Sequence, residues 1–209
     1  MKYIYTFALL LICLGCTSKP FKSKWVTQSA PEQFSVRFET TKGDFDIAIE
    51  RQWSPKAVDR FYQQVKHHLY DESVFYRVVP GFVAQFGDTK PQISNQWGAF
   101  KVPDEEVKLG NTKGTLSFAR GGKESRNAAL FINLVDNSRL DTLDYNGVKG
   151  FPAFGKVIRG MDVVLDLHGG YREQPGGKLN LLYTQPEEFF KAFPKLDRIL
   201  KISILKDKK

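Results

Sequence analysis

The chain has 209 residues, of which 42% are hydrophobic and 13% aromatic, and its 31 basic and 23 acidic side chains give a net charge of +8. Seventeen Phe, eight Tyr and three Trp supply enough apolar surface for a packed core, which excludes intrinsic disorder, and the length suits a single domain. The two cysteines, Cys13 and Cys16, lie close to the N-terminus, so the rest of the chain has no disulfide framework and no Cys-ligated zinc site.

Residues 1–16 predict a secretory signal, because Lys2 precedes an apolar run that is too short to cross about 30 Å of hydrocarbon. Residues 13–16, Cys-Leu-Gly-Cys, are similar to the lipobox of bacterial lipoproteins, which predicts lipidation of Cys16. A cleaved signal without a lipid and a C-x-x-C redox pair are the alternatives. We therefore expect an exported, lipid-anchored protein on the periplasmic side of a cell-envelope membrane, the outer membrane if the cell is Gram-negative. Residues 17–32 are polar and predict a tether, which leaves 33–209 as the domain.

The domain begins with two runs in which apolar and polar residues alternate, separated by Lys42-Gly43, and this pattern predicts a β-hairpin. Ser54-Pro55 predicts a helix N-terminus, and Val58, Phe61 and Val65 share one face of that helix. A long polar connection, 88–113, predicts a loop. Further strands are predicted at 74–79, 82–86, 115–119, 130–135, 153–157 and 200–204.

Two more helices are predicted near the C-terminus. The first covers 161–168 and ends at Gly169-Gly170. The second is a short aromatic helix with a capping box of Thr184 and Glu187. Many short strands with few helices predict a mainly β protein, and strands at both ends of the domain favour a closed barrel, because closure removes exposed edges.

The familiar catalytic motifs for nucleophilic, metal-dependent and phosphate chemistry are missing from the sequence. The three histidines, His67, His68 and His168, follow or end predicted helices and do not share a face as metal ligands would. We therefore expect them to be structural and expect no metal site.

The densest candidate for function is 75–88, FYRVVPGFVAQFGD, a strand–turn–strand in which Arg77 and Gln85 stand among apolar residues. An arginine in such a strand needs an acceptor, because an unpaired buried charge is costly. Taken alone, Arg77 could equally well bond a backbone carbonyl or reach a solvated rim.

This segment resembles the central signature of the cyclophilin-type peptidyl-prolyl isomerases. The likeness continues, in the same order and with similar spacing, through 113–120, 130–137 and 151–157, and it extends over about 34–168. The resemblance implies an eight-stranded antiparallel closed barrel capped by two helices. It also implies rotation about X–Pro bonds without a cofactor, which agrees with the missing nucleophile.

The resemblance implies roles for particular residues. Arg77 is the expected catalytic residue, and Gln85 is expected to bond the substrate backbone beside the rotating bond. A pocket for the proline ring is expected from Phe82, Val83, Phe131 and Leu140, with Phe151 where many members have His, and Ala119 and Arg120 are expected in the strand that binds the substrate main chain. The alternative for the aromatic residues is an ordinary core position.

The sequence departs from the family pattern at two positions. Ala129 stands where a substrate-contacting Gln is common, which predicts a rate about tenfold lower, because one such hydrogen bond is worth ~0.5–1.5 kcal/mol. Arg139 stands where cyclosporin-sensitive members carry Trp, which predicts weak binding of that drug.

The expected partners are proline-containing polypeptides, and we expect a monomer that touches a membrane only through the lipid. The main alternative is a lipid-anchored module that binds proline-containing segments with little turnover, which Ala129 favours and the intact Arg77 and Gln85 oppose. A structural envelope protein with a basic surface is a third hypothesis, but the charge is dispersed. Nothing in the sequence indicates nucleic-acid binding.

Overall fold

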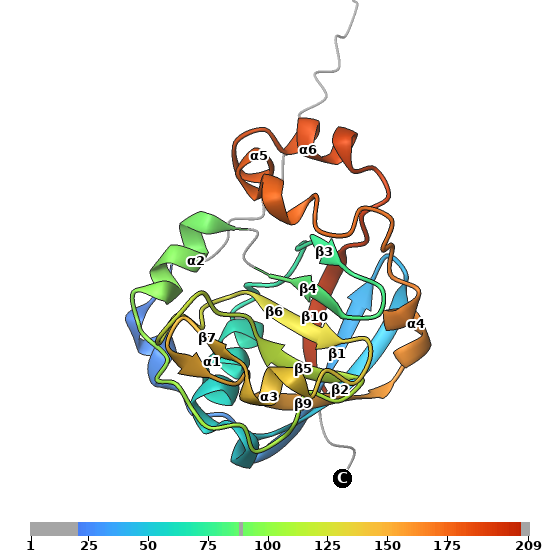
Figure 1. Ribbon diagram of the computed structural model, residues 1–209. Coiled ribbons are helices and arrows are strands. Elements are labelled where there is room, and N and C mark those ends of the chain that lie inside the picture. Colours follow the sequence, from blue (N-terminus) through green and yellow to red (C-terminus); the bar gives the residue numbers. More distant parts are fainter. Residues whose placement is uncertain (1–20, 88–89, 206–209) are drawn as a thin grey trace, which may run out of the picture.

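The computed structural model describes residues 21–87 and 90–205, and the predicted signal segment with Cys16 lies outside them (Figure 1). No helix within the described part of the chain combines the length and apolar character needed to cross a bilayer.

The core of the fold is one eight-stranded sheet in which every neighbouring pair is antiparallel. Its strands follow the order β10–β1–β2–β9–β5–β6–β4–β3. They are β1 (Gln33–Thr40), β2 (Gly43–Glu50), β3 (Arg77–Val78), β4 (Val83–Phe86), β5 (Thr115–Phe118), β6 (Leu130–Asn133), β9 (Ala153–Arg159) and β10 (Ile199–Leu205). A separate hairpin joins β7 (Asp144–Tyr145) to β8 (Val148–Lys149).

The prediction of a closed barrel is wrong, because the sheet is an open half-barrel with β3 and β10 at its two ends. The predicted strand over 74–79 pairs in the sheet only at Arg77 and Val78. The segments before β3 and β10 meet in a single bridge between Val74 and Arg198. The other residues of the segment make no ladder that would join the two ends.

The predicted alternation is confirmed in β1, and β2 follows it except at Asp46, which is buried as well. In β1, the residues Phe34, Val36 and Phe38 are buried and their neighbours are more exposed. Phe38 pairs with Phe45 of β2, and the two rings stack 4.6 Å apart in the core. Gly43 begins β2 with φ of +131°, a conformation that favours glycine.

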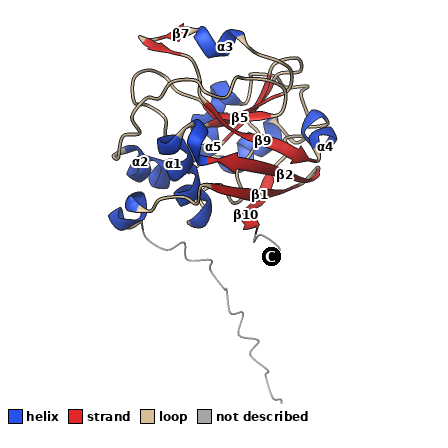
Figure 2. Cartoon of the chain, turned by 90° about the horizontal axis from the view of Figure 1, so that it is seen from below, coloured by secondary structure: helices blue, strands red, loops and turns tan. Residues whose placement is uncertain are grey.

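Six α-helices lie around the sheet in the described part of the chain, where the sequence patterns predicted three and the family resemblance implied two. They are α1 (Pro55–Lys66), α2 (Pro91–Gly98), α3 (Arg139–Thr142), α4 (Met161–Leu165), α5 (Leu179–Thr184) and α6 (Pro186–Ala192). Helix α1 begins at the predicted proline and buries Val58, Phe61 and Val65. Helix α2 lies in the connection expected to be a loop, where its Trp97 is fully buried. Figure 2 shows β10, β1, β2, β9 and β5 as successive strands, with α3 and β7 beyond β5.

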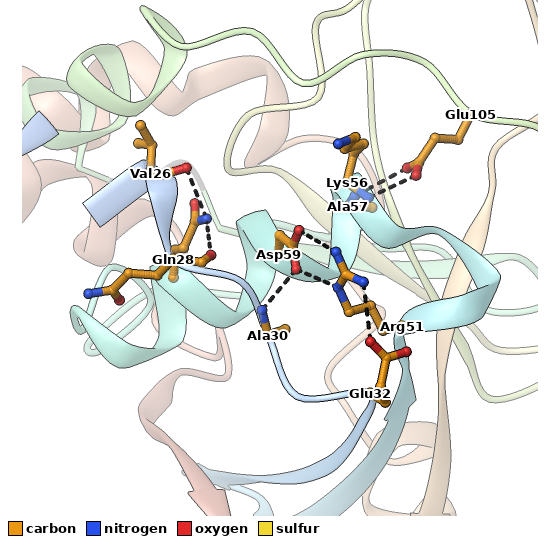
Figure 3. A network of polar contacts seen from close by, with 10 residues as sticks. Val26, Gln28, Ala30, Glu32, Arg51, Lys56, Ala57, Asp59 and Glu105 are labelled. Atoms are coloured by element: carbon orange, nitrogen blue, oxygen red, sulfur yellow. Dashed lines mark hydrogen bonds and ion pairs between the residues drawn. The ribbon is translucent and has the colours of Figure 1, made fainter. Parts of the chain in front are cut away.

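The N-terminus of α1 is capped from a distant part of the chain. Ser54 occupies the N-cap position, but its hydroxyl donates to Glu105 instead of accepting from the helix. The Glu105 carboxylate accepts the backbone N–H groups of Lys56 at 2.8 Å and Ala57 at 3.2 Å (Figure 3). A carboxylate from the long connection therefore satisfies donors that a helix start leaves unpaired.

Residues 21–32 pack on the domain, so the predicted tether is wrong for this part of 17–32. Trp25, in the 3₁₀ helix Ser23–Thr27, is buried and stacks on His67 with ring centroids 3.8 Å apart. The backbone N–H of Ala30 donates to Asp59 of α1 (Figure 3). A tryptophan in an otherwise polar stretch anchors the segment, because burying its ring is favourable.

The segment 169–194, between α4 and β10, packs as a unit that contains α5 and α6 and lies over β3 and β4 (Figure 1). Phe189 is fully buried and packs against Phe193, which in turn packs against Tyr171. The capping box predicted here is wrong, because Gln185 is the N-cap of α6 and the Thr184 hydroxyl donates to a carbonyl within α5. We call residues 169–194 the insert.

Candidate active site

Arg77 and Gln85 face each other across the antiparallel pair β3 and β4, as the sequence predicts for a strand–turn–strand. They are register partners, so their side chains project from the same face of the sheet. Nη1 of Arg77 donates to Oε1 of Gln85 at 3.3 Å, and Nε2 of Gln85 donates to the Tyr76 hydroxyl at 3.1 Å. The guanidinium carbon lies 5.4 Å from the centroid of the Phe82 ring. The guanidinium is therefore braced by an amide and an aromatic face.

The predicted pocket residues form an apolar cluster that is separate from the main core. Val83, Phe131, Leu140 and Phe151 pack together, with Phe82 and Ala119 against them. Phe131 and Phe151 therefore have neighbours of their own, apart from the main core, with their ring centroids 6.1 Å apart.

A cavity of about 410 Å³ opens at this cluster, and we call it the apolar hollow. All the predicted substrate-binding residues except Ala129 line it, and Arg77 and Gln85 lie at its wall. Apolar walls with a few directed polar groups are typical of sites for small apolar groups. The hollow therefore combines an apolar surface with a guanidinium that can donate hydrogen bonds.

A second cavity of about 600 Å³ adjoins the first, and we call it the second hollow. The two hollows share Arg77, Gln85, Ala119 and Arg120, so these residues form the ridge between them. Ala129, the remaining predicted contact residue, lines the second hollow. The ten predicted residues are therefore brought together, but they are divided between two adjoining hollows.

Glu173 of the insert is a member of the site that the sequence did not predict. Its Oε1 accepts a hydrogen bond of 2.7 Å from Nη2 of Arg77. This hydrogen bond lowers the pKa of Glu173 below its usual value, so the carboxylate is ionised at neutral pH. No local pattern marks Glu173, because its contact with Arg77 spans 96 positions of the chain.

Arg120 differs from Arg77 in its surroundings, because its guanidinium donates to three backbone carbonyls of the protein. It donates to the backbone carbonyls of Tyr145, Val148 and Gly150 and lies 4.4 Å from the centroid of the Phe151 ring. Burial lowers the pKa of Arg120, though its three acceptors suit a charged guanidinium. Arg120 therefore holds the β7–β8 hairpin beside the apolar hollow.

A buried amide network below the apolar hollow also went unrecognised in the sequence. The fully buried Asn111 donates from Nδ2 to Asp141 at 2.7 Å and to the carbonyl of Phe151 at 2.8 Å. Asn137 donates to the carbonyl of Phe82 at 3.0 Å. These bonds fix the backbone of two pocket aromatics, and the signal was hidden because Asn111 lies in the connection expected to be a loop.

Arg139 reaches the apolar hollow from α3, and its guanidinium carbon lies 4.7 Å from the centroid of the Phe82 ring. The ring of Phe82 thus meets both Arg77 and Arg139.

Over residues 21–87 and 90–205, His, Cys, Asp and Glu form no group of three that could hold a metal ion.

Comparison with known proteins agrees with this architecture. The profile of the family described as "Cyclophilin type peptidyl-prolyl cis-trans isomerase/CLD" matches residues 35–180. A peptidyl-prolyl cis-trans isomerase of Acinetobacter baylyi is 34% identical over 131 residues, covering 62% of this chain and 69% of the relative. Peptidyl-prolyl cis-trans isomerase B of Escherichia coli is 34% identical over 140 residues, covering 64% and 84% respectively.

A crystal structure of a cyclophilin-type peptidyl-prolyl cis-trans isomerase from Cryptosporidium parvum has the same fold. The TM-score is 0.62 at 21% identity, over 84% of this chain and 99% of that one. A second structure of that protein was determined in the presence of the dipeptide Ala-Pro, with a TM-score of 0.59. The strand–turn–strand with Arg77 and Gln85, the pocket cluster and these matches lead to one conclusion: the chain belongs to the cyclophilin-type peptidyl-prolyl cis-trans isomerase family.

Proposed function

We propose that this isomerase binds the proline of an extended polypeptide in the apolar hollow and that Arg77 stabilises the twisted X–Pro bond. The barrier to rotation is ~18–20 kcal/mol because the C–N bond has double-bond character. Exchange without a catalyst therefore takes tens to hundreds of seconds. A catalyst needs only to bind the twisted state more tightly than the planar states, so no nucleophile or cofactor is required.

Arg77 suits this task because of what surrounds it. Its guanidinium has five N–H donors in a rigid plane, and Gln85 and Glu173 engage one donor each. The remaining donors can hold the substrate carbonyl and approach the prolyl nitrogen once that nitrogen becomes pyramidal. In this proposal, Gln85 bonds the substrate backbone beside the rotating bond. The juxtaposition of Arg77 with the separate apolar cluster is the observation that carries this proposal.

The test is prolyl isomerisation of a short X–Pro peptide by the wild type and by Arg77→Ala. We expect kcat/KM to fall about 10²–10³-fold, the usual cost of removing a donor that stabilises developing charge. Arg159→Ala is the matched control, because Arg159 pairs with Asp46 and lies outside both hollows. Equal rates for wild type and Arg77→Ala would exclude Arg77 as the catalytic residue.

A module that binds proline-containing segments with little turnover is the second candidate, and Ala129 is the observation that favours it. It predicts tight binding of the same peptides together with a wild-type rate equal to that of buffer. The two candidates are therefore separated by measuring affinity and rate on one set of peptides.

We also propose that the protein is exported and anchored by a lipid on Cys16 at the periplasmic side of a cell-envelope membrane, where it assists the folding of exported proteins. The support is the signal-like segment and the Cys-Leu-Gly-Cys sequence that ends it. The test is incorporation of labelled palmitate in cells. We expect label in the wild type and in Cys13→Ala but none in Cys16→Ala. Label that persists in Cys16→Ala would exclude this anchor.

A further inference from the structure

We infer that the insert is part of the substrate-binding surface and that Glu173 makes the enzyme prefer polypeptides with a basic side chain in the second hollow. This inference rests on the proposed function, because it assumes that the proline occupies the apolar hollow. It names the class of substrate that the site favours.

The insert is fixed against the catalytic strands. Arg172 forms an antiparallel bridge with Val78 of β3, so the insert covers the free edge of the open sheet. A Cβ on Gly169 would lie 2.6 Å from Cγ of Pro80, which shows how closely the backbone approaches the β3–β4 turn. The buried Phe189 and Phe193 pack against each other within the insert. The wall that carries Glu173 is therefore packed internally and attached to β3 and to the β3–β4 turn.

The second hollow continues the apolar hollow across the ridge of four shared residues. Glu173, Gly176, Gly177 and Leu179 supply its wall from the insert. A polypeptide is continuous, so a chain with its proline in the apolar hollow and its backbone along Ala119 and Arg120 must place neighbouring residues in the second hollow. The side chains of those residues then face the insert.

The charge in the second hollow depends on Glu173, which is the only acidic residue among its described lining residues. The two cations there are Arg77 and Arg120, and the guanidinium of Arg120 already serves three carbonyls. Only Oε1 of Glu173 takes part in the hydrogen bond with Arg77, and the Glu173 side chain is 67% exposed. Because a carboxylate accepts about four hydrogen bonds, Glu173 can receive a substrate ammonium or guanidinium without releasing Arg77.

Removal of this carboxylate is expected to shift the preference for substrate charge in one direction. Without it, two guanidinium groups would face the hollow with no carboxylate beside them. The affinity for peptides with acidic side chains would then rise relative to the affinity for peptides with basic ones. The effect is expected to be modest, because Glu173 and its surroundings are open to water, and it should weaken as salt increases.

The test uses X–Pro peptides that carry Lys, Ala or Glu at one position at a time on either side of the proline. We measure kcat/KM and, by fluorescence anisotropy, the dissociation constant for wild type, Glu173→Gln and Glu187→Gln. At one or more positions, we expect the Lys-over-Glu preference to fall about threefold in Glu173→Gln at low salt. Glu187→Gln should keep the wild-type preference, because it removes the same charge from an exposed site on α6 outside the hollow.

An unchanged preference in Glu173→Gln at every position would overturn the inference, and so would an equal change in Glu187→Gln, which would indicate a general effect of net charge. The two readouts separate this failure from failure of the proposed function. Peptides that are turned over without charge preference exclude only the role of Glu173. Peptides that bind with the expected preference but are not turned over exclude only the catalytic proposal.

Discussion

At the scale of single residues, the site combines one group that the sequence marks clearly with one that it leaves unmarked. Arg77 stands in an apolar strand, where a charge needs a reason to be retained. Glu173, its partner at 2.7 Å, lies in a polar stretch where an acidic residue is unremarkable in the sequence. Sequence patterns therefore identify Arg77, whose charge is costly to bury, but not Glu173, the acidic residue that pairs with it.

Ala129 gives a prediction at this scale. It lines the second hollow beside the ridge of Arg77 and Gln85, so a glutamine there can offer the substrate one more hydrogen bond. We expect Ala129→Gln to raise kcat/KM by up to about tenfold, since such a bond contributes ~0.5–1.5 kcal/mol. Ala192→Gln, on the exposed face of α6, is the control and should leave the rate unchanged. A rate that stays flat in Ala129→Gln would show that this position does not limit turnover.

At the scale of elements, the position of α1 follows from its own sequence, but its stabilisation does not. Ser54-Pro55 predicts where the helix begins, and the helix begins there. Glu105, about fifty positions later, accepts the two N–H groups at its start. Arg126, whose side chain is only 1% exposed, pairs with the same carboxylate at 3.1 Å. A tertiary contact thus ties α1 to the loop that borders the second hollow.

Loss of this tie is expected to destabilise the fold. Glu105→Ala would leave Arg126 buried without its acidic partner, and breaking a buried pair in this way costs about 3–5 kcal/mol. We expect a decrease of that order in the free energy of unfolding, measured by urea denaturation. Glu106→Ala removes the same charge from an exposed neighbour and should change stability little. Equal stability of the two variants would contradict this account.

At the scale of the whole molecule, Asp46 joins three strands of the sheet. It accepts hydrogen bonds from Arg159 of β9 and Arg37 of β1, and these bonds hold the pKa of Asp46 well below its usual value. Because the folded pKa is below the unfolded value of about 3.9, the contribution of Asp46 is fully present above that value. It is lost as the pH falls toward the folded pKa.

The dependence of stability on pH tests this contact. We expect the wild type to lose stability from pH 5 downward more steeply than Asp46→Asn, which has no carboxylate to protonate at this position. Urea denaturation at a series of pH values measures the difference. Asp44→Asn, in the same strand and exposed, should follow the wild-type curve. Parallel curves for wild type and Asp46→Asn would show that Asp46 does not contribute to acid sensitivity.

The sequence by itself determined what depends on short spacings along the chain. The alternation of β1 and β2, the buried face of α1 and the strand–turn–strand of Arg77 and Gln85 were all predictable, because periods of two and three to four residues decide which side chains share a face. The likeness to a family added the membership of the apolar hollow, which apolar residue types alone do not distinguish from a core.

The tertiary structure decided whatever depends on contacts between distant segments. It opened the sheet that was expected to close, packed residues 21–32 onto α1, and brought Glu173 and Asn111 to the site. The physical reason is that such contacts form only when a core has fixed the relative positions of its elements. Polar residues in connecting segments carry no periodic signal that reports their partners.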